Sequence, residues 1–291
     1  MSKNKRPSLI KQIDQSLRSR LVIGRSKRPD KADGSYRRYI YSWQTYKNYM
    51  RQLGLFARWC KKTHNVKYLK ECRQYVKEYM ETRSELSVWT QKLDLAALQK
   101  LYQEYPEAPE KPFGITLQPR LRQDIKRSRQ QATRDKDFSL ENNADLITFC
   151  RCTGLRRSEL QELRGTDITA DGLQLHVTHN TKGGRWRMAP IVGTPAEVAM
   201  VQQMCRTAAD GRVWPHVPSS ADIHSYRADY CQRVYQTATR PVDQIPADDK
   251  YYCRGDRKGV ILDRKAMLIA SRALGHNRID VIASHYLYNL Q

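Results

Sequence analysis

Apolar residues recur at steps of three and four over residues 42–102, and this spacing most limits what the chain can fold into. After Ser42 the series is Tyr46, Tyr49, Met50, Leu53, Phe56, Ala57 and Cys60. It returns from residue 69 and again from residue 95, with basic side chains on the other faces. Such steps place side chains on one face of an α-helix. The sequence therefore predicts three amphipathic helices that form a compact helical domain.

Basic residues outnumber acidic ones, and the excess is concentrated in the first half of the chain. The 291 residues include 52 Lys and Arg against 30 Asp and Glu, a formal net charge of +22. Residues 1–136 carry a net charge of +19 and residues 137–291 only +3. Solubility does not require one sign of charge to gather in one half, whereas a polyanion attracts such a surface. We therefore expect a polyanion such as nucleic acid as a partner, and the family resemblance described below implies that it is double-stranded DNA.

The same patterns divide the chain into three segments. Residues 1–40 hold 12 Lys and Arg against three Asp with few periodic apolar residues, which predicts a basic arm that is disordered when free. An inert tail is the alternative. Residues 41–136 combine the helical DNA-binding domain with a basic linker, because four prolines between Pro106 and Pro119 end the periodicity and a dense basic run follows. The second domain occupies residues 137–291.

The second domain is predicted to be mainly helical, with one small antiparallel sheet. Residues 173–177 alternate as a strand does, residues 182–184 (Lys-Gly-Gly) form a turn, and residues 187–191 return as the second strand. The remaining residues have the patterns of helices and loops. The expected fold class is therefore mainly α, of the α+β kind.

Several familiar classes of protein are excluded by what the sequence does not contain. The seven cysteines are odd in number and lack repeated spacing, which favours reduced thiols in the cytoplasm over a disulfide framework. There is no run long enough to span a membrane and no apolar core of a signal peptide. There is also no clustered acidic metal site, glycine-rich phosphate loop or zinc motif. We expect a cytoplasmic, nucleoid-associated protein that uses no metal, no cofactor and no membrane.

The stretch TGLRRSEL at residues 153–160 predicts an arginine held beside the start of a helix. Gly154 suits the left-handed end of a helix that begins near Ser139, and Ser158 with Gln161 has the spacing of a capping box. Arg156 then lies in the corner before a helix N-terminus, where a guanidinium and free backbone N–H groups can bind one phosphate. For this motif alone, an ordinary surface arginine is the alternative.

Further basic residues follow in a fixed order along the second domain. Lys182 lies at the tip of the predicted hairpin. His224 and Arg227 are three residues apart, so they share one face of a helix that begins near Asp222. The apolar side chains of that helix lie on another face, which directs the basic pair away from the buried side.

The last signal is Leu274-Gly275-His276 with a tyrosine beyond it. These residues end a helix that Asp263 caps, and a further helix opens after residue 277. Tyr286 follows His276 by ten residues and shares a face with Ile279 and Ile282. A buried structural tyrosine is the alternative here, since the chain has 17 tyrosines.

Taken in this order, the signals resemble the tyrosine recombinase, or phage integrase, family over about the last half of the chain. The resemblance implies DNA cleavage without a metal. It implies that Arg156 and Arg227 bind the scissile phosphate, that Lys182 is the general acid and that His224 is a base or proton relay. It further implies that His276 donates a hydrogen bond to a non-bridging oxygen of that phosphate and that Tyr286 is the nucleophile. The family usually places its tyrosine nine residues after this histidine, where this chain has His285. One extra residue in the turn at residues 277–278 would restore the direction of Tyr286, and Tyr288 is the alternative nucleophile.

The resemblance also implies a biological activity and an assembly. The expected activity is site-specific strand exchange for integration or excision of a mobile element, by a homotetramer on two DNA duplexes that can recruit accessory DNA-bending proteins. Because only five residues follow Tyr286, we expect assembly through the tyrosine-bearing helix or the DNA rather than through a docked C-terminal helix. The alternatives are a type IB topoisomerase-like nicking and closing enzyme and an inactive DNA-binding protein of the same fold.

Overall fold

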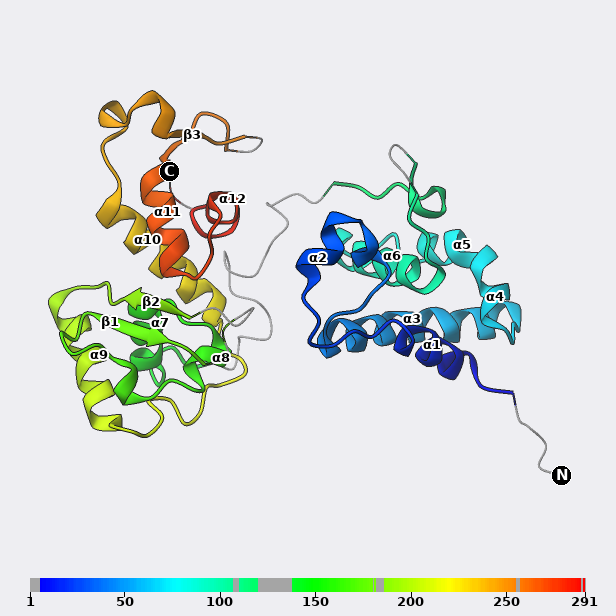
Figure 1. Cartoon of the computed structure of the whole chain (residues 1–291), viewed down its shortest axis with the longest axis horizontal. Helices are drawn as coiled ribbons and strands as arrows, with labels where there is room; N and C mark the ends of the chain where they lie inside the picture. The colour runs from blue at the N-terminus through cyan, green and yellow to red at the C-terminus, as the bar shows by residue number, and fades with distance from the viewer. Residues whose placement is uncertain are drawn as a thin grey trace. The chain divides into compact units, whose positions relative to one another are not determined.

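The computed structural model describes residues 6–106, 110–119, 138–179, 181, 186–254, 257–288 and 290. They belong to two compact units, Met1–Arg122 and Gln123–Gln291, whose elements are labelled in Figure 1. Each unit has its own hydrophobic core. Among the described helices, none combines the length and the apolar character needed to cross a membrane.

Helices form the first unit, and serine side chains cap four of the described ones, Ser26 among them. The order is α1 (Leu9–Arg18), α2 (Lys27–Ala32), α3 (Trp43–His64), α4 (Leu69–Cys72), α5 (Val76–Glu81) and α6 (Val88–Tyr102), with 3-10 turns at Ser35–Arg37, Arg73–Tyr75 and Pro112–Gly114. Ser8, Ser42 and Ser87 each accept a hydrogen bond from the backbone N–H three residues later. The three helices predicted from periodicity are confirmed, although the middle one is broken into α4, a 3-10 turn and α5.

The prediction of a disordered basic arm is wrong for residues 6–40. α1 packs on α3 and buries Leu9, Ile13 and Leu17 in the core of this unit. Farther along, the backbone of Ile40 accepts a hydrogen bond from Val22 N at 2.9 Å and donates one to Arg20 O at 2.8 Å. Three apolar residues at steps of four are enough to join a core, and the surrounding charge obscured them. The basic run 120–136 lies outside the described residues.

The second unit is mainly helical, as predicted, but it contains two small antiparallel sheets. Its elements are α7 (Ala144–Thr153), α8 (Arg157–Leu160), β1 (Gln174–Val177), β2 (Arg187–Pro190), α9 (Pro195–Ala208), α10 (Ile223–Ala238), β3 (Lys250–Tyr252), β4 (Ile261–Asp263), α11 (Arg264–Ala273), α12 (Ile279–Val281) and a π-helix, Ile282–Tyr286. Short 3-10 turns lie at Gly165–Asp167, Val242–Gln244 and Ala247–Asp249.

The first sheet is the predicted hairpin, and the second was not predicted. β1 pairs with β2 so that Gln174 lies opposite Pro190 and Val177 opposite Arg187. β3 pairs with β4 from Lys250 opposite Asp263. The strands of the second sheet have only three residues each, which is too short for alternation to be visible in the sequence.

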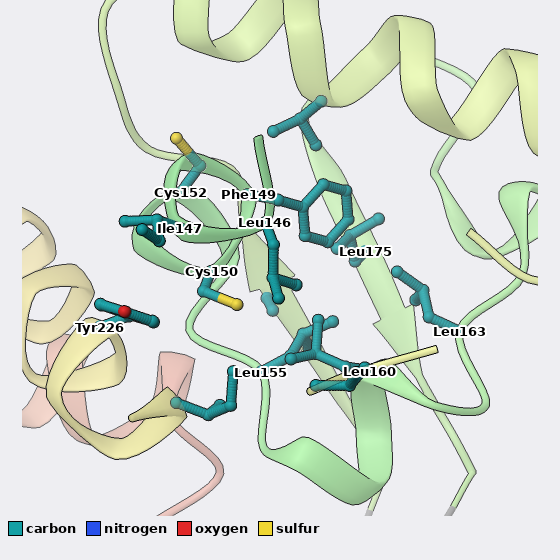
Figure 2. Close-up of a cluster of buried hydrophobic side chains, with 14 of the residues drawn as sticks. Leu146, Ile147, Phe149, Cys150, Cys152, Leu155, Leu160, Leu163, Leu175 and Tyr226 are labelled. Carbon is teal, nitrogen blue, oxygen red and sulfur yellow. The ribbon is translucent and has the colours of Figure 1, made fainter. Parts of the chain in front are cut away.

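Two buried clusters in this unit share α10. The first packs α7, the corner after it and β1 together, and Figure 2 shows Phe149, Leu155, Leu160 and Leu175 within it, with Tyr226 approaching from α10. The second joins α10 to α11 and the C-terminal π-helix. α10 therefore fixes the corner after α7 with respect to the end of α11, and the candidate site lies where these segments meet.

Candidate functional site

The corner between α7 and α8 holds Arg156 in a fixed position. α7 ends at Thr153, and its C-cap residue Gly154 has a left-handed backbone at φ +59° as predicted. A Cβ atom at this position would lie 2.1 Å from a ring carbon of Tyr230, so the corner requires glycine for both reasons. Leu155 is fully buried next to it (Figure 2). The backbone that carries Arg156 is thus anchored on the core side.

The cap of α8 differs from the predicted capping box of Ser158 and Gln161. The helix begins at Arg157, so Arg156 is the N-cap residue and Glu159 occupies the third helical position. Glu159 Oε2 accepts a hydrogen bond from the backbone N–H of Arg156 at 2.8 Å, and Oε1 accepts one from Nη1 of the same arginine at 2.6 Å. Serine is a common N-cap residue and arginine is not, which is why the sequence placed the helix start too late.

Glu159 also binds a second arginine, Arg187, and the sequence analysis gave neither residue a role. Arg187 Nη1 and Nη2 donate to the two carboxylate oxygens at 2.9 and 2.8 Å. Both side chains are buried, with exposed fractions of 2% for Glu159 and 6% for Arg187. Burial by itself raises the pKa of the carboxyl, but the hydrogen bonds and charge of Arg187, with those of Arg156, outweigh it and lower the pKa to about 2. Glu159 is therefore ionised and orients both arginines.

The C-terminal end of α11 gathers three arginines around its last carbonyls. Leu274 O accepts from Arg156 Nη2 at 3.3 Å and from Arg227 Nη2, while Ala273 O accepts from Arg187 Nε at 3.0 Å. These carbonyls have no partner within the helix and lie at its negative end, so cations suit them. Gly275 follows with φ +69°, and a Cβ there would lie 3.0 Å from Arg187 Cδ.

Arg227 is buried rather than directed away from the buried side as predicted. Its exposed fraction is 1%, and Nη1 donates to Gly154 O while Nη2 donates to Leu274 O. Its Nε is buried without a hydrogen-bond partner among the described residues. Burial lowers the pKa of Arg227 to about 10, so the side chain remains charged at neutral pH. The pattern of apolar residues could not show that this arginine replaces an apolar side chain inside α10.

A pocket of about 280 Å³ opens over these arginines, with Arg156, His224 and Arg227 among the residues that line it. Asp222, which also lines the pocket, caps α10 by accepting the backbone N–H of Ser225. His224 is exposed on the first turn of α10. Because cationic groups predominate in its lining, the pocket suits an anion such as a phosphate.

Tyr286 lies beside both predicted histidines. Its Oη is 3.4 Å from His276 Nε2, and its ring centroid is 5.5 Å from that of His224. Cζ of Arg227 lies 6.0 Å from the same ring centroid. The structure therefore brings together five of the six predicted residues: Arg156, His224, Arg227, His276 and Tyr286. The sixth, Lys182, lies outside the described residues.

A π-helix explains how a tyrosine ten residues after His276 reaches this position. Residues 282–286 form the π-helix, in which Leu287 N donates to Ile282 O, five residues earlier, at 3.0 Å. Each π-turn holds more residues than an α-turn, so this segment can accommodate the extra residue, as an alternative to the turn at residues 277–278. Tyr286 is 5% exposed and faces the site, whereas His285 is exposed.

Tyr288 has a different environment from Tyr286. Cζ of Arg257 lies 5.8 Å from its ring centroid, whereas the rings of His224 and His276 lie beside Tyr286. Arg157, which the sequence analysis did not count as catalytic, donates to the backbone oxygens of Pro218 at 2.7 Å and Ala221 at 2.6 Å. Arg157 therefore holds the 218–221 loop that forms one wall of the pocket.

The described residues offer no group of three or more His, Cys, Asp or Glu side chains arranged to hold a metal ion. All seven cysteines are free and buried.

Comparison with known proteins identifies the fold. No protein-family model and no curated protein sequence matches the chain. Two solved structures of the Tn1549 transposon integrase match 96% of this chain over 95% of their own, each with a TM-score of 0.51. The one in complex with transposon right end DNA is 12% identical in sequence, and the one in complex with circular intermediate DNA is 14% identical. The chain therefore has the fold of a transposon integrase, as its resemblance to tyrosine recombinases led us to expect.

Proposed function

We propose that this chain is a site-specific DNA recombinase that cuts and rejoins DNA through a covalent bond between Tyr286 and a 3′ phosphate. The observation that carries the proposal is the convergence of Tyr286 with His224, His276 and Arg227. A tyrosine that served only the core would not need its hydroxyl beside a histidine, next to a cationic pocket. The fold, shared with a transposon integrase that is seen on DNA, supports the same reading.

In the proposed reaction, Tyr286 Oη attacks the phosphorus of one phosphodiester. The phenolic proton passes to His224, because a neutral phenol is a much weaker nucleophile than the phenolate. The bond from phosphorus to the 5′ oxygen breaks, and Lys182 donates the proton that the leaving oxygen needs. The products are a 3′-phosphotyrosine and a free 5′ hydroxyl. The phosphotyrosine ester replaces the broken phosphodiester bond and conserves its free energy, so joining to a new strand requires no ATP.

The cationic groups stabilise the transition state. The pentacoordinate phosphorus carries more negative charge than the starting phosphodiester, and preorganised donors offset this charge. Arg156 and Arg227 are already oriented by Leu274 O, and Nε of Arg227 has no hydrogen-bond partner within the part of the chain that the structure describes. His276 donates to a non-bridging oxygen in the same step. No metal or cofactor takes part in this scheme.

We further infer that strand exchange takes place between two DNA duplexes held by four copies of the chain, for integration or excision of a mobile element. The net charge of +22 supplies the attraction to the duplex phosphates. The mobile-element setting is inferred from the shared fold with a transposon integrase.

The experiment that tests this proposal traps the covalent intermediate on a nicked suicide substrate that carries the ends of the element. Tyr286→Phe is compared with Tyr288→Phe, which is a matched control because it removes a hydroxyl two residues away. We expect a protease-sensitive protein–DNA adduct with wild type and Tyr288→Phe but not with Tyr286→Phe. An adduct lost only in Tyr288→Phe would move the nucleophile to Tyr288.

Two further outcomes would overturn the proposed class. Tight DNA binding with no adduct from wild type would leave a DNA-binding protein without cleavage activity. Relaxation of supercoiled plasmids that lack the element's site would indicate a type IB topoisomerase-like enzyme instead. We expect cleavage to be restricted to the site, with no relaxation of other plasmids.

A further inference from the structure

The segment that carries Tyr286 is held by its backbone carbonyls. Tyr286 O accepts a hydrogen bond from Gln232 Nε2 of α10 at 3.2 Å. Leu287 O accepts from Arg257 Nη1 at 2.7 Å, and Leu290 O accepts from Nη2 of the same arginine. The π-helix ends at Tyr286, so these carbonyls lie at and beyond a helix end and need partners from elsewhere. A single side chain, Arg257, supplies two of them.

Arg257 belongs to the connection between β3 and β4. Its exposed fraction is 8%, and Val260 N donates to its backbone oxygen at 3.1 Å. Cys253 N donates to Val260 O at 3.0 Å and closes the same connection. The hairpin therefore gives Arg257 a fixed origin, from which the side chain reaches residues thirty or more positions away in the sequence.

The chemistry of the contact favours arginine over lysine. A guanidinium presents several N–H donors in a rigid plane, so its two terminal nitrogens can each donate to a different carbonyl. A lysine ammonium is a point charge on a flexible stem and does not fix two acceptors in the same geometry. A cation also suits the negative end of a helix.

Buried apolar side chains hold the segment in the core, but they do not fix the orientation of its last turn, which Arg257 contacts. Ile282 and Leu287 are fully buried, and they set the depth of the segment in the core. The phenolic oxygen of Tyr286 must in addition keep its 3.4 Å approach to His276 Nε2, which depends on how the end of the π-helix is turned. Arg257 holds the carbonyl of Leu287, the next residue after the tyrosine, so it acts directly on that orientation.

We propose that Arg257 is a positioning residue that holds Tyr286 in the active site of its own chain. The inference rests on the proposed function, since it assigns Arg257 to the nucleophile of that reaction. Arg257 does not contact the DNA phosphate in this scheme and acts through the segment that follows the tyrosine, by its hydrogen bonds to the carbonyls of residues 287 and 290 and its contact with the Tyr288 ring. Its contribution therefore concerns the rate of covalent attack, not the affinity for DNA.

The test compares Arg257→Ala, Arg257→Lys and Lys258→Ala in the full-length protein. Lys258 is an exposed neighbour on the same hairpin, so Lys258→Ala removes the same charge without removing the two hydrogen bonds. The readouts are the DNA affinity and the rate of adduct formation on the nicked substrate at saturating protein. For Arg257→Ala we expect a rate loss of about 10- to 100-fold at unchanged affinity, because a misplacement of about 1 Å can cost a factor of that size. Arg257→Lys should fall between Arg257→Ala and wild type, and Lys258→Ala should match wild type.

An equal rate for Arg257→Ala and wild type would overturn the inference. An equal loss of DNA affinity in Arg257→Ala and Lys258→Ala would also overturn it, since Arg257 would then contribute only its positive charge to the attraction of DNA. Should Arg257→Ala fail to fold, Arg257→Lys still decides the question through hydrogen exchange. We expect faster exchange in the peptide of residues 279–288 with no change in α7, and unchanged exchange in both would refute the contact's role.

The hydrogen-exchange measurement also separates this inference from the proposed function. It requires neither DNA nor cleavage, so it reports whether Arg257 holds the segment even in a protein that forms no adduct. Absence of an adduct from wild type would count against the recombinase, whereas normal exchange in the Arg257 variants would count against the positioning role.

Discussion

Replacing Arg187 with methionine should destabilise the second unit by about 3 kcal/mol. Arg187 is 6% exposed and donates two hydrogen bonds to the buried carboxylate of Glu159 and a third to Ala273 O. Methionine keeps much of the length and apolar contact of the side chain, but it donates no hydrogen bond. Glu159 would then be a buried charge whose remaining ionic partner among the described residues is Arg156.

The magnitude follows from the pKa of Glu159. Its ordinary value of 4.5 falls to about 2 in the folded chain. Each pKa unit corresponds to about 1.4 kcal/mol, so the partners of the ionised carboxyl contribute about 3 kcal/mol at neutral pH. Breaking a buried ion pair by removing one partner typically costs about 3–5 kcal/mol, and the retained contact with Arg156 places the expected value at the lower end.

The pH dependence has a definite sign. A carboxyl whose pKa is lowered on folding stabilises the protein fully above its unfolded pKa, here 4.5, and loses that contribution as the pH falls through its folded pKa, here about 2. The difference in unfolding free energy between wild type and Arg187→Met should therefore be constant from pH 7 to about pH 5. It should shrink between about pH 4.5 and pH 2.

The assay must report on one unit within the full chain. We would incubate the protein in urea at each pH, label it with a hydrogen-exchange pulse at a single pH, and read peptides from α7 and α10 by mass spectrometry. Peptides from α3 report the first unit and should not change. Arg212→Met is the matched control, because Arg212 pairs with Glu162 at 2.9 Å on the surface, where such a pair contributes about 1 kcal/mol or less. A loss for Arg187→Met no larger than this control would refute the reasoning, as would a difference that stays flat down to pH 3.

Two other predictions concern the corner after α7 and the origin of the tyrosine. Gly154→Ala should destabilise the second unit by at least about 2 kcal/mol in the same urea assay, because it adds a Cβ atom at a positive φ and against the ring of Tyr230. A loss of unfolding free energy below about 1 kcal/mol would contradict this. A mixture of Tyr286→Phe and Arg227→Ala proteins should form no adduct on the suicide substrate, because Tyr286 lies beside the histidines of its own chain. An adduct in the mixture would mean that the tyrosine is donated by a neighbouring copy.

The sequence predicted those parts of the fold that depend on long periodic runs. α3 and α6 show an apolar stripe over many turns, and serine caps mark where they begin. α1 was missed because its stripe of Leu9, Ile13 and Leu17 is short and lies among basic residues. The β3–β4 hairpin was missed because a strand of three residues shows no period. Both α1 and the β3–β4 hairpin are stabilised mainly by burial against residues distant in the sequence. A local pattern of residues cannot predict such contacts.

The candidate site was predicted from residue types and order, but its supporting contacts were not. Arg156 and Arg227 were found from their motifs, whereas the burial of Arg227 and its sharing of Leu274 O depend on how α10 meets α11. A signal for Glu159 was present, since it lies three residues after Arg156, the spacing of a capping box. Arg187 had no signal beyond its place in a strand. Buried ion pairs between distant residues are set by tertiary packing and leave no local trace.

The register of the tyrosine yields the sharpest test of where the extra residue lies. The sequence analysis placed it in the turn at residues 277–278, whereas the π-helix at residues 282–286 offers a second place for it. Deleting His285 should convert the π-turn into an α-turn, because the hydrogen bond from Leu287 N to Ile282 O would then span four residues instead of five. His285 is exposed, so its removal should leave the buried face of the segment in place.

We therefore expect the protein that lacks His285 to form the adduct within about tenfold of the wild-type rate. Deleting Asn277 instead should shorten the turn between His276 and α12, draw Tyr286 out of line and reduce the rate by about 100-fold. Both variants have the tyrosine nine residues after the histidine, so they differ only in where the residue was removed. If the Asn277 deletion is the active one, the extra residue belongs to the turn, and the π-helix does not bring Tyr286 into the site.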